Sequence, residues 1–249
     1  MKYATKSMIS LLCAVAMILT MLATLEIGVQ AAEGLDLTDM QIVLPDGNTA
    51  VENTAASELK KYIFQMTGET LLIVKEGQNA GAGIYIGATE FAKENGVTYP
   101  TAGDEKGESW AVQAVDGNLV LCGAPKRGVL YAVYHLLEDV LGVRWWNMWE
   151  EYVPEGNAIV PADYTSSGVP AMEYREIFIG QETVKDYPFY ARNRMNGSHT
   201  NIPQNYGDEE AYAAPGHTHT FNRYFPAVFG DGGGWLSAIS DGGDFSTDP

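Results

Sequence analysis

The chain contains very little cysteine. Only Cys13 and Cys122 occur among its 249 residues. Cys13 lies in an apolar N-terminal stretch, so the remainder of the chain has a single thiol and cannot form an intramolecular disulfide. Because Cys122 ends the apolar run that starts at Leu119, we expect it to be a small buried hydrophobic side chain. A fold stapled by disulfides is therefore excluded.

Positive charge is also scarce. The sequence has 15 Lys and Arg against 32 Asp and Glu, a formal net charge of −17. Nucleic acids and anionic membrane surfaces are bound by clustered Lys and Arg, so we expect neither as a partner. An anionic sugar such as a glucuronate would need a local basic pocket against this field.

Long apolar runs are missing except at the N-terminus. Lys2 and Lys6 precede an apolar core from Met8 to Leu22, and a small-x-small cleavage pattern ends at Ala31. These features predict a secretory signal peptide. The alternative is an uncleaved anchor, because residues 7–25 are uncharged and long enough to span a bilayer. With cleavage, we expect a secreted or cell-surface protein that makes no further membrane contact.

Metal and nucleotide motifs are weak or incomplete. His217 and His219 stand two apart without a nearby third ligand, and the chain has no HExxH motif. Gly123 and Gly128 have the spacing of a phosphate loop before a predicted helix, but the Lys-Ser/Thr pair that should follow is absent. We therefore expect neither a metal nor a cofactor.

Strand and helix patterns alternate from about residue 33 to residue 160. Thr49 and Glu52 form a capping box that opens a helix to about Met66, and Gly68 follows it. Asp116-Gly117-Asn118 is a strong hairpin signal. The remaining expected elements are strands at Gln41 to Leu44, Leu71 to Val74, Gly83 to Gly87, Trp110 to Val115 and Leu119 to Cys122, and a short helix around Thr89 to Asn95.

A second long helix is predicted to begin near Arg127. Its apolar side chains recur at helical spacing, and Gly142 stands where a left-handed C-cap would be. The expected inner face is Leu130, Val133, Tyr134, Leu137 and Leu141. The fold class that follows is α/β (α+β), with a mixed β-sheet covered by two long helices.

The segment after this helix carries a family resemblance. An Arg-Gly before an aromatic-rich helix, then LGVRWW ending at Trp146 and EYVP starting at Glu151, resembles the N-terminal domain of bacterial α-glucuronidases. The same domain type precedes the barrel in β-hexosaminidases and in secreted bacterial proteins with an uncharacterised barrel-like domain. TAASELKKYIFQMTGETLLIV and IYIG follow the order of that family's first helix and next strands. The resemblance covers roughly Leu35 to Gly197 and implies carbohydrate metabolism.

The composition changes after residue 160. Residues 161–169 are rich in Pro, Ser, Thr and Asp without periodicity, which predicts a linker. A strand at Glu173 to Ile179 and a helix at Asp186 to Asn196 then resemble the first elements of a (β/α) barrel, which typically needs about 250 residues. The expected organisation is a signal peptide at 1–31, an α/β domain at 33–160, the linker at 161–169, the truncated start of a (β/α) barrel at 170–228, and a Gly-rich, poorly ordered tail at 229–249.

Arg144, Trp145 and Trp146 are the best candidates for ligand contacts. Aromatic rings stack on the apolar faces of sugars, and Arg makes bidentate contacts with carboxylates. The alternative is packing, with one Trp in the core and the other at an interface, because neighbouring strand residues point to opposite faces. Trp149 extends the same cluster.

Four further candidates for substrate binding lie near or after the expected start of the barrel: Arg175, Arg192, Asn193 and His219. Arg175 would end the first barrel strand, near the usual position of an active site. The alternative is an ion pair with Glu173 or Asp186. His219 lies in a segment that resembles a substrate-side loop.

No catalytic residue is assigned. Glycoside hydrolysis normally needs two carboxylates, and those of the resembled enzymes lie on later barrel strands that this sequence lacks. The expected function is that of an accessory domain in a secreted, glycoside-hydrolase-like protein that degrades polysaccharides, with carbohydrate as its partner. The alternatives are a non-catalytic module that binds glycan or a cell-surface partner, and a gene fragment without a function of its own.

Overall fold

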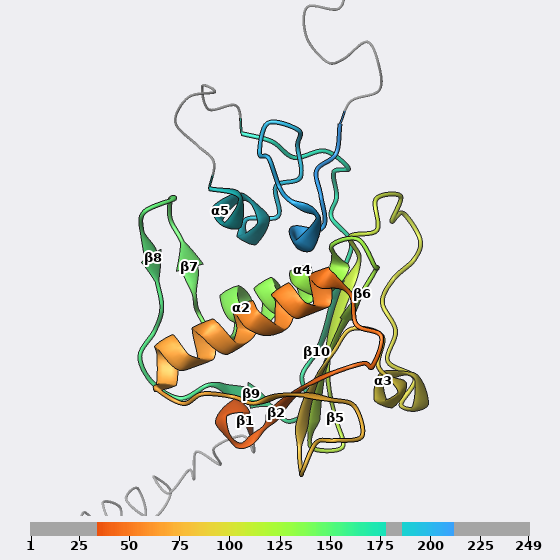
Figure 1. The fold of residues 1–249 in the computed structure, drawn as a ribbon, viewed down its shortest axis with the longest axis vertical. Coiled ribbons are helices and arrows are strands. Elements are labelled where there is room, and N and C mark those ends of the chain that lie inside the picture. Colours follow the sequence, from red (N-terminus) through yellow and green to blue (C-terminus); the bar gives the residue numbers. More distant parts are fainter. Residues whose placement is uncertain (1–33, 178–185, 212–249) are drawn as a thin grey trace, which may run out of the picture.

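The computed structural model describes residues 34–177 and 186–211, and its centre is a six-stranded mixed β-sheet (Figure 1). The strand order is β10-β5-β6-β4-β2-β3. The four strands β6, β4, β2 and β3 are parallel to one another, whereas β5 runs antiparallel to both of its neighbours, β6 and β10. The strands are β2 (Gln41–Leu44), β3 (Ile73–Lys75), β4 (Gly83–Ile86), β5 (Trp110–Val115), β6 (Asn118–Gly123) and β10 (Thr165–Gly168).

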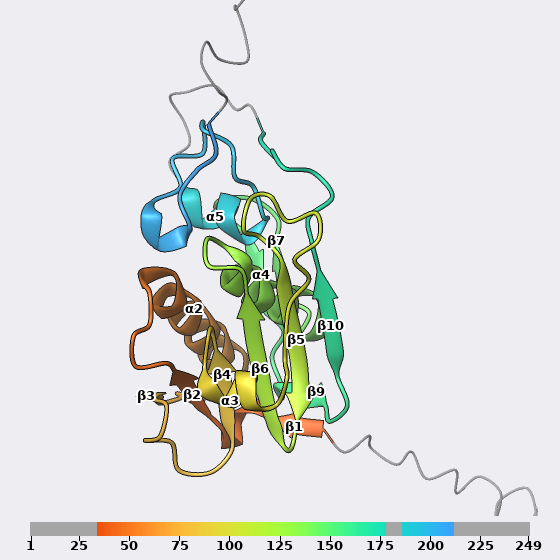
Figure 2. The same cartoon turned by 90° about the vertical axis from the view of Figure 1, so that its right-hand side faces the viewer.

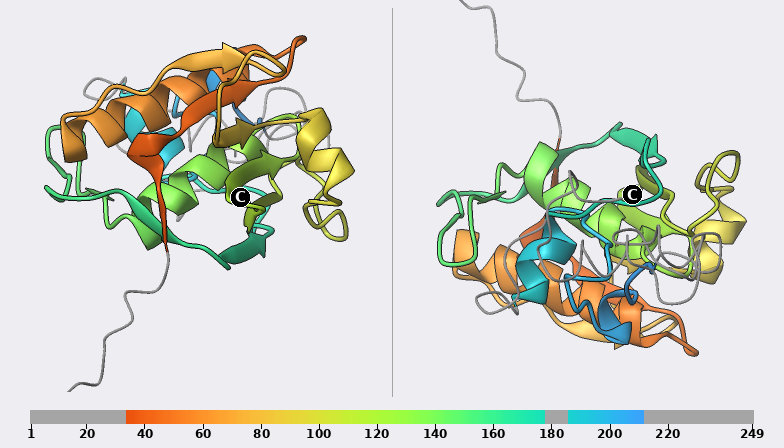
Figure 3. Two further views of the ribbon diagram at one scale, coloured as in Figure 1. Left: turned by 90° about the horizontal axis from the view of Figure 1, so that it is seen from below. Right: turned by 90° about the horizontal axis from the view of Figure 1, so that it is seen from above.

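Two long helices cover one face of this sheet. They are α2 (Ala50–Thr67) and α4 (Gly128–His135), which continues into the π-helical turn η2 (Leu136–Val140). The short helix α3 (Glu90–Glu94) lies on the opposite face, as the turned views show (Figures 2 and 3). The predicted mixed sheet with two covering helices is confirmed.

The alternation of strand side chains divides the core between the two faces. Ile42, Ile84 and Leu121 are fully buried in the larger cluster, beneath α2 and α4. Their sequence neighbours, including Val43 and Val120, are buried in the smaller cluster that α3 covers. Because successive strand residues point to opposite faces, a strand covered on both sides has to be apolar throughout. This explains the continuous apolar runs of β4 and β6.

Local signals determine the ends of α2. The Thr49 hydroxyl accepts the Glu52 main-chain N–H, and the Glu52 carboxylate accepts the Thr49 N–H at 2.7 Å. Gly68 ends the helix at φ +81°, a conformation that costs little only for a residue without a Cβ. The predicted capping box and glycine stop are confirmed.

Residues 165–168, within the expected linker 161–169, are strand β10. This strand pairs antiparallel with β5, from Thr165 opposite Gln113 to Gly168 opposite Trp110. The sequence predicts a linker here and gives no sign of this strand. An edge strand exposed on one side needs no apolar alternation, so Thr-Ser-Ser-Gly can complete the sheet through main-chain hydrogen bonds alone.

Two small antiparallel pairs flank the sheet: β1 (Gly34–Asp36) with β9 (Ile159–Pro161), and β7 (Arg144–Trp145) with β8 (Glu151–Tyr152). The short turn η1 (Leu37–Asp39) follows β1. Within residues 34–177 and 186–211, no helix has both the length and the apolar character needed to cross a bilayer.

The C-terminal described segment, 186–211, packs over the ends of α2 and α4 (Figure 1). It contains α5 (Tyr187–Arg192), within the helix expected at 186–196, and the short turn η3 (Gln204–Tyr206). The strand expected at 173–179 is wrong for residues 173–177, and 178 and 179 lie outside the described residues. The carbonyl of Arg175 instead accepts the N–H groups of Asn196 and Gly197, at 3.0 and 3.1 Å.

A buried carboxylate joins this segment to the sheet and helices. Glu108, 2% exposed, lies just before β5 and accepts hydrogen bonds from Arg127 at the start of α4 and from Arg175, both at 2.8 Å. Asn196 Nδ2 donates to it at 2.8 Å, and the Tyr131 hydroxyl at 3.2 Å. Four donors from three separate segments therefore converge on one carboxylate.

Replacing Glu108 should strongly destabilise the fold. Glu108→Ala leaves Arg127, itself 1% exposed, without its main buried counter-charge, and loss of one partner of a buried ion pair typically costs about 3–5 kcal/mol. Glu108→Gln keeps two polar atoms and should lose less. Urea unfolding measures both, with the exposed Glu105→Ala as matched control, expected to change the free energy by less than about 0.5 kcal/mol. A Glu108→Ala variant as stable as the control would contradict this role.

Candidate functional site

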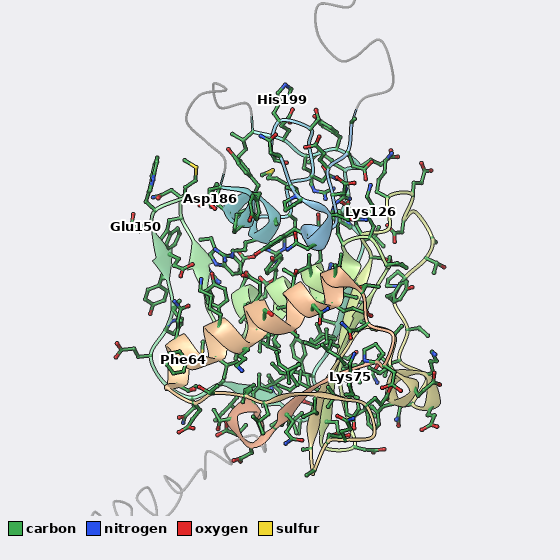
Figure 4. All side chains as sticks on the ribbon, viewed as in Figure 1. Phe64, Lys75, Lys126, Glu150, Asp186 and His199 are labelled. Atoms are coloured by element: carbon green, nitrogen blue, oxygen red, sulfur yellow. The ribbon has the colours of Figure 1, made fainter. Side chains whose placement is uncertain are left out.

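A pocket of about 250 Å³ lies between the β7–β8 pair and the start of α5. In Figure 4 the labelled Glu150 and Asp186, which both line this pocket, lie on the same side of the molecule. The side chains that decide its chemistry are Trp145, Trp149, Glu150, Glu151, Asp186 and Arg192. Two of the predicted ligand-contact residues, Trp145 and Arg192, are therefore brought together in space.

The inner wall of the pocket is a hydrogen-bonded chain of three side chains. The indole N–H of Trp145 donates to the hydroxyl oxygen of Tyr62 at 2.8 Å, and that hydroxyl donates to Glu151 Oε2 at 2.6 Å. Burial raises the pKa of the Tyr62 hydroxyl well above its usual value of 10.0, so it remains a donor at physiological pH. Trp145 is thus held in one orientation, with its ring edge-on to Tyr62.

Ionisation of Glu151 is favoured by its surroundings. Partial burial opposes the charge, but the Tyr62 hydroxyl bond and the charges of Lys61 and Arg192 outweigh it and lower the pKa of Glu151 below its usual value of 4.5. Lys61 Nζ lies 3.4 Å from Oε1, and Arg192 NH1 lies 3.7 Å from Oε2. Glu151 is therefore a charged acceptor at neutral pH.

Arg192 is positioned by a buried partner on α2. Its Nε and one terminal nitrogen donate to the two oxygens of Glu58, at 2.8 and 3.0 Å, in a bidentate arrangement. Burial opposes the charge, but Glu58 outweighs it and raises the pKa of Arg192. The other terminal nitrogen is directed toward Glu151. Arg192 thus lies in the pocket with most of its charge neutralised by this chain's own carboxylates.

Two further tryptophans extend into solvent from the same hairpin. Trp146 is 62% exposed and Trp149 is 83% exposed, whereas Trp145 is 6% exposed. Trp145 is buried and Trp146 is exposed, as expected for neighbouring strand residues that point to opposite faces. Large exposed aromatic side chains this close to a polar pocket are uncommon on a surface that contacts only water.

The other predicted residues lie elsewhere. Arg144 donates to the carbonyls of Glu138 and Val143, at the end of the long helix. Asn193 caps α5 through the carbonyl of Phe189. Neither lines the pocket between the β7–β8 pair and α5, which we call the hairpin pocket.

Arg175 belongs to the Glu108 cluster. The alternative ion pair expected with Glu173 or Asp186 is wrong, because the partner of Arg175 is Glu108. Its guanidinium is 12% exposed and also contacts the Tyr131 hydroxyl at 3.0 Å. His219 and His217 lie outside the described residues.

Sequence reasoning missed Glu58, Tyr62 and Glu151 as site residues. Tyr62 is fully buried on α2, and helical spacing alone gives no partner for its hydroxyl. Glu58 offered one signal, a charged residue next to the apolar Leu59 on the inner side of α2, and its side chain is 8% exposed. Its partner lies 134 positions away in the sequence.

Metal ligation finds little support in the described part of the chain, where no group of three His, Cys, Asp or Glu side chains is arranged to hold an ion. Cys122 is buried as predicted, and burial raises the pKa of its thiol to about 11. It is therefore a poor nucleophile at neutral pH. The hairpin pocket is left with acceptors, one paired guanidinium and aromatic rings, a set suited to binding hydroxyl groups.

Comparison with solved structures shows a shared fold. The chain is similar to a GH115 4-O-methyl-α-glucuronidase with specificity for decorated arabinogalactans, with a TM-score of 0.51 and 17% identity over 68% of this chain. It also matches the N-acetyl-β-hexosaminidase of Streptomyces plicatus, with a TM-score of 0.42 and 16% identity over 66% of this chain. The chain spans 28% and 30% of the length of these two proteins.

No family model matches the sequence. No curated protein matches it either. The structural similarity to the GH115 protein is therefore the comparison on which we rely, and it shows a shared fold only.

The pocket makes stability depend on pH through Glu151. Because the folded-state pKa of Glu151 is lowered, its contribution is complete above the usual value of 4.5 and is lost as pH falls through the folded pKa. Glu151→Gln should therefore lower the free energy of unfolding by about 1 kcal/mol at pH 7, and by less as the pH falls through the folded pKa. Tyr62→Phe removes this donor and also the acceptor of the Trp145 N–H, so part of its cost should remain at low pH.

Urea unfolding from pH 7 down to pH 3 measures this effect. Glu155→Gln, an exposed carboxylate outside the network, is the matched control. A difference between Glu151→Gln and the wild type that stays constant over this pH range would show that the ionised carboxylate does not stabilise the fold.

Proposed function

We propose that this chain is a non-catalytic, N-terminal α/β part of a secreted, glycoside-hydrolase-like protein that acts on polysaccharides. The fold it shares with a GH115 α-glucuronidase supports a carbohydrate-active protein. The family resemblance of LGVRWW and EYVP supports the same class. The export step rests on the leader pattern of residues 1–31, and the organisation after residue 170 rests on the resemblance alone.

The observation that carries the proposal is the hairpin pocket with its tryptophans. Sugars present apolar C–H faces and a ring of hydroxyl groups, and proteins bind them with aromatic rings and charged acceptors. Here Trp149 is exposed beside Glu150, Glu151 and Asp186 in a pocket of about 250 Å³. The arrangement offers an aromatic platform and acceptors within one small volume.

Catalysis in this pocket is disfavoured by its electrostatics. A glycosidase needs one carboxylic acid that is still protonated at working pH and can donate to the leaving oxygen. Glu151 has a lowered pKa and is held by Tyr62, so it cannot fill that role. Glu151 is therefore suited to accepting hydrogen bonds from a ligand rather than to donating a proton, and we place the chemistry of the full-length protein outside the described residues.

The second candidate is a cell-surface interaction module without a glycan ligand. The exposed Trp146 and Trp149 also favour this role, because exposed aromatic residues are enriched at protein interfaces. A glycan panel separates the two functions.

Removal of the exposed Trp149 should weaken glycan binding. On a panel of xylo-, glucurono- and hexosamine oligosaccharides, Trp149→Ala should weaken binding of the retained class about tenfold, equivalent to about 1.4 kcal/mol. Phe64→Ala, an aromatic 52% exposed near the C-terminal end of α2 (Figure 4) and outside the pocket lining, is the matched control and should bind as the wild type does. Calorimetric titration measures both. If the wild type retains no sugar of the panel, the interaction module is favoured instead.

A further inference from the structure

A second and larger cavity lies at the carboxyl ends of the parallel strands. Its volume is about 840 Å³, and it shares no lining residue with the hairpin pocket. The cavity is lined by the residues at which the chain leaves the four parallel strands β2, β3, β4 and β6. These residues are Pro45, Glu76, Gly87 and Gly123. The size lies within the range of pockets that hold small organic ligands.

The cavity lies at a change in the direction of winding. From β2 the chain passes through α2 to β3 on one side, and then to β4 on the other side of β2. Open α/β sheets bind their ligands in the crevice at such a point. Helices α2 and α3 both begin at this edge, and helix N-termini attract anions. The position would therefore suit a phosphate or carboxylate ligand if its N–H groups were free.

The chain's own carboxylates occupy those N–H groups. Glu52 Oε2 accepts the Thr49 N–H at 2.7 Å, and Oε1 accepts the Ala88 N–H at 3.1 Å, so one carboxylate bridges the loops after β2 and β4. Glu52 is 6% exposed. Gly87, at φ +91°, leaves room for it, because a Cβ there would overlap the Glu52 carboxylate.

The N-terminus of α3 is occupied in the same way. The two oxygens of Glu76 accept the N–H groups of Glu90 and Phe91, at 2.9 and 2.8 Å. An incoming anion would meet Glu52 and Glu76 where it needs donors. The ammonium group of Lys93, which lines the cavity, already pairs with Glu90 at 2.6 Å.

The rest of the lining favours a ligand rich in hydrogen-bond donors. Asp46 and the Tyr99 hydroxyl offer acceptors around the cavity, and Val97 and Val129 offer apolar surface. We propose that this cavity is a second binding site, distinct from the hairpin pocket, that takes an uncharged polyhydroxyl ligand such as a neutral oligosaccharide and excludes phosphates and carboxylates.

Cys122 lines the cavity and serves as an internal reporter. Its modification by a small thiol reagent at pH 9, where this buried thiol ionises more than at neutral pH, followed by mass spectrometry of the peptide that contains it, measures access to the site. Maltotriose or cellotriose should slow the modification at least threefold at saturation, whereas ATP, inorganic phosphate and glucuronic acid should leave the rate unchanged. The proposal would be overturned if any of the anions protected Cys122, or if both trisaccharides failed to protect it.

A blocking variant separates this site from the hairpin pocket. Gly47 lines the cavity, its φ is not positive, and a Cβ there meets no atom within 4 Å, so Gly47→Trp can fill the space without strain. It should abolish protection of Cys122 by the trisaccharide. Glu69→Trp, beyond the other end of α2, and Trp149→Ala should both retain it. Protection that survives Gly47→Trp, or is lost with Trp149→Ala, would place the ligand elsewhere.

A rescue experiment tests the occupied anion position directly. Glu52→Ala removes the bridging carboxylate and exposes two N–H donors, so acetate should bind there and raise the melting temperature of this variant. The wild type should not respond to acetate at the same ionic strength. If acetate leaves the melting temperature of Glu52→Ala unchanged relative to chloride, Glu52 does not fill an anion site and the basis for excluding anions is wrong.

Discussion

The Glu108 carboxylate is the interaction on which the rest of the structure depends. It is buried, and it meets the guanidinium groups of Arg127 and Arg175 together with Asn196 and Tyr131. Burying such charges is expensive, and an apolar replacement of similar shape can be equally stable. What this cluster provides is specificity: the segment around Arg175 and Asn196 can satisfy its polar groups in one position over the sheet and helices. The Glu108 carboxylate, just before β5, therefore fixes the position of the C-terminal part over the sheet and helices.

The hairpin pocket is a consequence of this arrangement. With residues 186–211 held in place, α5 faces the β7–β8 pair, and Arg192 reaches Glu58 on α2. That ion pair neutralises most of the arginine and leaves a pocket dominated by acceptors. The same principle recurs at the carboxyl edge of the sheet, where Glu52 occupies donors that a ligand would otherwise use. The hairpin pocket and the cavity at this edge are thus suited to donor-rich ligands, as the proposed function requires.

Local features of the fold were predictable because local residues determine them. The capping box of Thr49 and Glu52 and the stop at Gly68 depend on neighbours within four positions. Strand β10 was missed because an edge strand is held by main-chain hydrogen bonds that any sequence can make. The partners of Arg175 and Arg192 could not be predicted, since Glu108 and Glu58 lie 67 and 134 positions away. Trp145 and Arg192 were identified by residue type, but the pocket that joins them depends on the tertiary fold.

Native-state hydrogen exchange of the full chain tests most directly whether the C-terminal segment and the sheet domain form one cooperative unit. The N–H groups of Asn196 and Glu210 donate within the C-terminal part, and the N–H of Tyr131 donates within α4. If the buried cluster joins these parts, all three amides open with the same free energy and respond equally to added denaturant. Exchange of Asn196 and Glu210 at a free energy several kcal/mol below that of Tyr131 would contradict this account, because the segment would then open while the sheet and helices remain folded.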